Sequence, residues 1–62
     1  MKEAATIAFR DLDSSDDALV IVRYDAEQVS LCLSLMKDGD LEVFMDKGSA
    51  TKLIEALNEA VA

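Results

Sequence analysis

The middle of the chain alternates hydrophobic and polar positions, whereas the C-terminal end changes to a helical spacing. Leucines occupy every second position of residues 29–35, the period of a strand with one buried face. Residues 41–45 alternate in the same way, and the intervening Asp38-Gly39 is a strong hairpin signal. These patterns predict two antiparallel strands that share one hydrophobic face.

The hairpin loop can be chosen from the pairing it imposes. A two-residue loop at Asp38-Gly39 would set Leu35 opposite Glu42, a carboxylate among leucines. A three-residue loop, 37–39, makes every pair hydrophobic and requires positive φ at Gly39. The predicted pairs are then Leu35 with Leu41, Leu33 with Val43 and Leu31 with Met45. We call these six residues and the side of the sheet that carries them the leucine face.

Further elements extend the hairpin on both sides. Residues 18–24 are rich in β-branched side chains and predict a central strand, and residues 5–10 predict a first strand. Hydrophobic residues of the C-terminal segment recur at helical spacing, with Asp46 as the expected N-cap and Ser49 as its rival. They are Ala50, Leu53, Ile54, Leu57 and Val61. The predicted fold is a single α+β domain, residues 1–62: an antiparallel β-meander of three to four strands with one amphipathic helix packed on the leucine face.

The opposite face of this sheet is also expected to carry hydrophobic residues. Cys32 and Phe44 belong to it, and the second strand adds either Leu19 and Ile21 or the alternating set Val20, Val22 and Tyr24. One helix covers one face, and an exposed hydrophobic patch marks an interface, unless the N-terminal residues fold over it. We therefore predict an interface at Leu19, Ile21, Cys32 and Phe44, or along an edge strand.

Length and composition point to self-association as well. A chain of 62 residues buries little surface, and small domains compensate with disulfides, metals or oligomers. One cysteine and no histidine exclude an internal disulfide and disfavour zinc. We expect a homodimer, the commonest symmetric assembly.

Acidic residues gather in the segments that the meander brings to one end. They are Asp11, Asp13, Asp16, Asp17, Asp38 and Asp40. An EF-hand loop would need a glycine at the position of Asp16 and a glutamate at that of Val22, so we predict no metal site, and weak divalent binding is the alternative. With a net charge of −7 the chain should bind neither nucleic acid nor a membrane directly. These carboxylates are candidate contacts for a basic protein partner.

The sequence lacks the residues that an enzyme would use. Without histidine the commonest general base is missing, and no glycine-rich phosphate loop is present. Cys32 lies in the middle of a predicted strand of a chain without histidine, so we interpret it as a small packing residue and not as a reactive thiol. We expect a non-enzymatic, cofactor-free interaction module, and the absence of a signal-peptide pattern favours the cytoplasm. The alternative is an acidic inhibitor, as phages encode, that mimics nucleic acid and blocks a basic nucleic-acid-binding protein.

Overall fold

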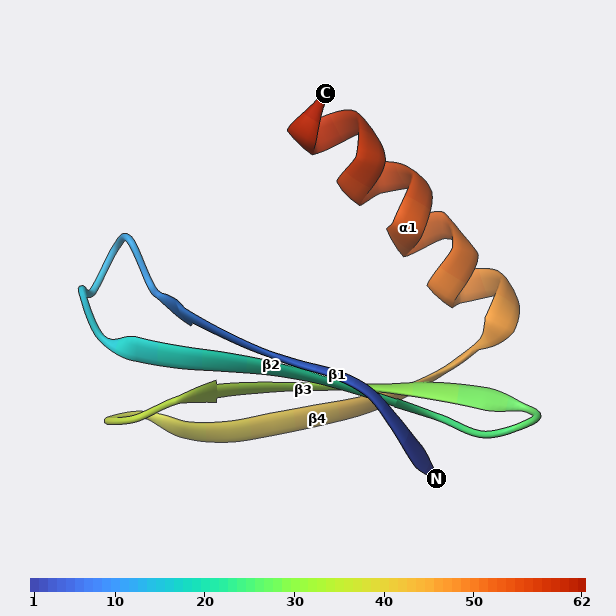
Figure 1. Cartoon of the computed structure of the whole chain (residues 1–62), viewed down its shortest axis with the longest axis horizontal. Coiled ribbons are helices and arrows are strands. Elements are labelled where there is room, and N and C mark those ends of the chain that lie inside the picture. Colours follow the sequence, from blue (N-terminus) through green and yellow to red (C-terminus); the bar gives the residue numbers. More distant parts are fainter.

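A computed structural model describes residues 1–62 as one antiparallel sheet followed by one helix. The strands lie in the order β1-β2-β3-β4, so that each is paired with its neighbour in the sequence (Figure 1). This confirms the predicted α+β meander with a C-terminal helix. The elements are β1 (Lys2–Arg10), β2 (Asp17–Tyr24), β3 (Gln28–Leu35), β4 (Gly39–Asp46) and α1 (Lys47–Val61).

The β3–β4 register differs by two residues from the predicted one. Leu33 lies opposite Leu41 and Leu31 opposite Val43, and the loop is 36–38 instead of 37–39. A shift of two positions leaves every side chain on its own face, because successive strand residues alternate between faces. The predicted leucine face is therefore present in spite of the wrong pairing. Gly39 has φ of 90°, which confirms the predicted positive value.

The registers of β1 and β2 decide which of their residues join the leucine face. Val20 lies opposite Leu33 on one side and Ile7 on the other, so the leucine face includes Val20, Val22 and Tyr24. Leu19 and Ile21 consequently lie on the opposite side, together with Cys32 and Phe44. We call this opposite side the far face. β1 pairs beside β2 as an edge strand, and it does not fold over either face.

α1 begins directly after β4, with no residue between the two elements. The Asp46 side chain accepts a hydrogen bond from the Ser49 backbone N–H at 2.7 Å, which confirms Asp46 as the N-cap. Lys47 holds the first turn in place: its Nζ donates to the Asp25 carbonyl at 2.7 Å and lies 5.6 Å from the centre of the Tyr24 ring. From this anchor the helix rises on the leucine side at a steep angle to the sheet (Figure 1).

The helix packs against β3 and β4, yet it encloses almost nothing. Ala18 is the one buried hydrophobic residue, and no residue of α1 is buried. The chain exposes 4843 Å², whereas a compact monomer of 6.7 kDa exposes about 3900 Å². Its radius of gyration is 12.5 Å, compared with about 10.6 Å for a compact domain of this length. The structure is therefore open, and its hydrophobic interior faces outward.

Candidate interaction surfaces

The most hydrophobic concavity is a groove of about 430 Å³ between α1 and the leucine face. Twelve of its 13 lining residues are hydrophobic, and the remaining one is Lys47. From the helix, Ile54 and Leu57 line the groove although they are 58% and 55% exposed. The other lining residues are Ala4, Ile7, Val20, Val22, Tyr24, Val29, Leu31, Met45, Ala50 and Leu53. Large exposed hydrophobic patches are rare on monomers and mark interaction sites, so we interpret this groove as a surface that another molecule covers.

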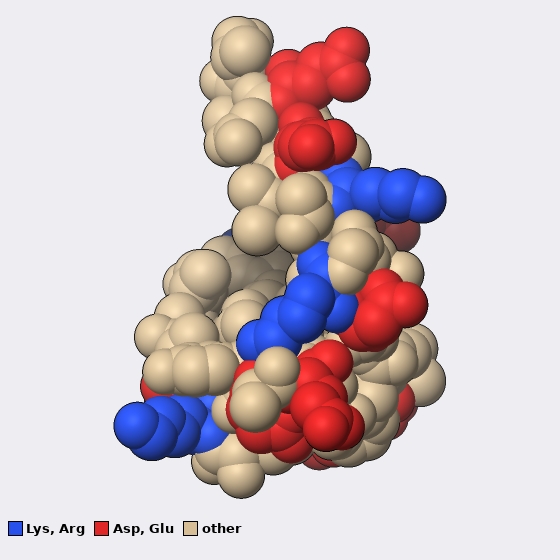
Figure 2. All heavy atoms as spheres, turned by 90° about the vertical axis from the view of Figure 1, so that its right-hand side faces the viewer, with Lys and Arg blue, Asp and Glu red and all other residues tan.

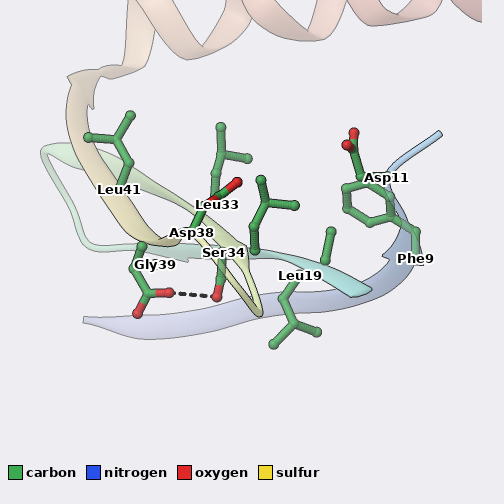
Figure 3. A pocket seen from close by; sticks show the side chains of 11 residues that line it. Phe9, Asp11, Leu19, Leu33, Ser34, Asp38, Gly39 and Leu41 are labelled. Atoms are coloured by element: carbon green, nitrogen blue, oxygen red, sulfur yellow. Dashed lines mark hydrogen bonds between the residues drawn. The ribbon is translucent and has the colours of Figure 1, made fainter. Parts of the chain in front are cut away.

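The leucine face continues beyond this groove toward the end of the sheet that lies away from the helix. A second hollow of about 380 Å³ is lined there by Phe9, Leu33 and Leu41 among others. Figure 3 shows Leu33 and Leu41 pointing to the helix side of the sheet, with Leu19 on the other side. Phe9 and Leu33 are each 46% exposed, and Leu41 is 63% exposed. The uncovered surface thus extends along most of the leucine face.

The far face brings together the four predicted interface residues, but it is partly polar. Ile21 lies directly opposite Cys32, Leu19 comes two positions before Ile21 in β2, and Phe44 lies diagonally across from Cys32 on β4. Of these, Phe44 is 57% exposed and Leu19 is 36% exposed.

Polar contacts interrupt this far-face cluster. The Glu42 carboxylate lies 3.5 Å from Arg23 Nη1 and accepts a hydrogen bond from Ser30 Oγ at 3.0 Å. Ser34 Oγ donates to Asp40 at 2.6 Å. A face on which charged and hydroxyl groups pair in this way is better suited to water than the leucine face.

Asp16 differs from the other acidic candidates because its side chain is 8% exposed. One carboxylate oxygen accepts the Lys37 backbone N–H and the other accepts the Asp17 backbone N–H, both at 3.0 Å. Asp16 therefore joins the β1–β2 loop to the β3–β4 loop, a structural function that was not predicted, whereas its contact with a partner stays a prediction. Sequence reasoning missed this function because the loop pattern shows only that Asp16 is polar.

The remaining acidic candidates stay at the surface at the same end of the sheet. Asp13, Asp17, Asp38 and Asp40 are exposed, and Asp11 is half-buried. Hydrogen bonds from the Ser14 hydroxyl and backbone N–H lower the pKa of Asp11 below its ordinary value of 3.8. The structure has no group of three or more His, Cys, Asp or Glu side chains arranged to hold a metal ion.

Apart from Lys47, which lines the groove, the charged residues of the helix lie on one flank. Figure 2 shows acidic side chains along one side of α1, while the other side of its upper part carries no charged residue. The uncharged side includes the residues at helical spacing that line the groove, Ala50, Leu53, Ile54 and Leu57. A surface formed by these helix residues together with the leucine face therefore carries little of the net charge of the chain.

No family model, curated protein or solved structure matches this chain. The one helix is neither long nor hydrophobic enough to cross a membrane.

Sequence reasoning placed the helix residues Ile54 and Leu57 in the interior and sought the interface elsewhere. A signal against that placement was available in the sequence. The leucine face spans four strands, whereas the helix stripe has five hydrophobic residues on 15 positions. A single helix about 10 Å wide covers roughly two strands spaced ~4.8 Å apart, so much of the face was bound to remain open.

Proposed function

We propose that this chain is a small, non-enzymatic protein-interaction module of the cytoplasm that acts as a homodimer. The observation that carries the proposal is the uncovered hydrophobic interior, in which Ala18 is the only buried hydrophobic residue. Burial of hydrophobic surface is the dominant favourable contribution to both folding and association. A chain that leaves this surface open gains stability when another molecule covers it.

A second copy is the occupant that needs no further component. Symmetric dimers use the same patch on both chains, so a self-complementary hydrophobic face is sufficient. The groove has a single charged residue in its lining, so that two copies meet without bringing their carboxylates together. The net charge of −7 per chain then remains on the outer surfaces, where water screens it.

The acidic end of the sheet supports a second candidate function. The Asp16 hydrogen bonds hold the two acidic loops side by side, which keeps Asp11, Asp13, Asp38 and Asp40 at one end of the molecule. We propose as the alternative that this end binds a basic nucleic-acid-binding protein in place of its nucleic acid. Such a complex would weaken steeply as salt is added, because its attraction is electrostatic.

The solution mass tests the dimer directly. Light scattering at tens of micromolar is expected to give about twice the chain mass of 6.7 kDa. A mass of one chain that persists up to millimolar concentration would reject the homodimer. The acidic-inhibitor alternative is independent of that result and is tested by the salt dependence of binding to a basic protein.

A further inference from the structure

We infer that two copies join through their leucine faces, with α1 of each copy lying in the groove between the helix and the sheet of the other. This inference rests on the proposed homodimer and specifies which surface forms it. The sequence pointed instead to the far face or to an edge strand. Three features of the structure favour the leucine face.

The first feature is the amount of surface left open. The chain exposes roughly 900 Å² more than a compact monomer of its mass. A standard protein interface buries about 800 Å² on each partner. Covering the leucine face in a dimer would therefore reduce the exposed surface of each chain to that of a compact monomer of its mass.

The second feature is the shape of the opening. The sheet and the rising helix bound the groove on two sides, and Ile54, Leu57 and Val61 stay exposed, the last at 82%. The helix of a second copy presents this same stripe and can contact the leucine face and the first helix together. A twofold axis between the two helices makes the helix–sheet and the helix–helix contacts at once, because the same patch forms the interface on both chains.

The third feature is the difference in polarity between the two faces. The groove lining includes one charged residue, Lys47, whose Nζ is already bonded to the Asp25 carbonyl. On the far face, Arg23 and Glu42 form an ion pair beside Phe44 and Cys32. An ion pair that is buried loses its hydration, and this cost offsets much of the attraction between the two charges. The leucine face is therefore the better interface.

A matched pair of substitutions separates the two faces. Ile54 on the helix is 58% exposed and Phe44 on the far face is 57% exposed, so a glutamate at either position is similarly solvated in the monomer. We expect Ile54→Glu to weaken the dimer about 30-fold or more, the effect of losing a central interface residue. Phe44→Glu should leave the dissociation constant within about twofold. Sedimentation equilibrium measures both, with circular dichroism to verify that each variant is folded.

The unaltered protein offers a second test because it has one isoleucine on each surface. Ile7 lies on the leucine face, Ile54 on α1 and Ile21 on the far face. In a sample with labelled isoleucine methyl groups, dilution through the dissociation constant should shift the Ile7 and Ile54 signals and leave Ile21 in place. This measurement does not depend on any variant folding.

The outcomes distinguish the inference from the function on which it rests. A shift confined to Ile21, together with a dimer lost in Phe44→Glu and kept in Ile54→Glu, would overturn the leucine-face dimer while retaining the homodimer. A dimer that survives both substitutions would also overturn it, because an edge strand would then be the contact. A protein that remains monomeric at all concentrations would remove both proposals.

Discussion

At the scale of single residues, the loops of this small protein are organised by aspartates. Asp25 accepts hydrogen bonds from the Glu27 and Gln28 backbone N–H groups and closes the β2–β3 turn. Asp46 caps α1, and Asp16 connects two loops that are 21 residues apart in the sequence. The N-cap was predictable because capping is local, whereas the role of Asp16 depends on a contact across the sheet.

Replacement of Asp16 by alanine is expected to destabilise the fold by about 1–3 kcal/mol. The change leaves the backbone N–H groups of Lys37 and Asp17 without their acceptor in a part-buried site. Denaturant unfolding measures the loss. Asp13→Ala is the matched control in the same loop, because Asp13 is exposed, and its effect should stay within about 0.5 kcal/mol. Equal effects of the two substitutions would contradict the assigned role.

Acid should weaken the protein through two of its aspartates, Asp46 and Asp25. Hydrogen bonds from Ser49 lower the pKa of Asp46 below 3.8, and those from Glu27 and Gln28 lower that of Asp25. A carboxyl whose folded pKa lies below its unfolded pKa stabilises the fold above the unfolded value, and this contribution is lost as the pH falls through the folded value. Unfolding at pH values between 5 and 2.5 should therefore show falling stability below about pH 4.

The Asp46→Asn variant isolates one contribution to this pH dependence. Asparagine caps a helix about as well as aspartate but does not ionise in this range. The variant should keep most of its stability at neutral pH and lose less of it on acidification. A pH profile identical to that of the unaltered protein would show that the cap does not contribute.

At the scale of elements, alternation and helical spacing placed the strands and the helix correctly. The β3–β4 register was wrong by two residues because the hydrophobic pattern has a period of two and repeats after that shift. The loop that decides between the two registers involves Gly39, whose positive φ was predicted but whose exact place in the turn was not. Face assignment is thus more robust than pairing.

The two glycines should respond oppositely to alanine. Gly39 has φ of 90°, a conformation that strains any residue with a Cβ, so Gly39→Ala is expected to cost about 1 kcal/mol or more. Gly48 lies in the first turn of α1, and a Cβ there would meet only Asp46 Oδ1 at 3.6 Å. Gly48→Ala should gain about 0.5 kcal/mol by reducing the freedom of the unfolded chain. Chemical denaturation of the two variants, at equal protein concentration, measures both changes.

At the scale of the whole molecule, the extent of burial could not be read from the sequence. The pattern correctly identified a helix stripe and a leucine face, but it left open which alternating set of β2 shares a side with Cys32 and Phe44, and the structure shows that this set is Leu19 and Ile21. It did not reveal that α1 rises from the sheet instead of lying along it. That angle follows from the direct passage of β4 into the helix and from the contacts of Lys47, which are tertiary.

Salt should strengthen the homodimer and weaken the alternative complex. Two chains of charge −7 repel each other, and added salt screens this repulsion while leaving hydrophobic contacts intact. The dimer dissociation constant, measured by sedimentation, should decrease when the sodium chloride concentration is raised from about 20 mM to about 500 mM. A dissociation constant that rises with salt would indicate that opposite charges hold the complex together.

The absence of any connecting residue between β4 and α1 has a consequence for how fast two copies meet. A helix on a flexible tether would have to be immobilised at the moment of contact, which costs entropy and slows recognition. In this protein the Asp46 cap and the Lys47 contacts hold α1 in position before a partner arrives. Encounter then resembles the docking of two rigid bodies, with a rate constant of about 10⁵–10⁷ M⁻¹s⁻¹ once the mutual repulsion is screened.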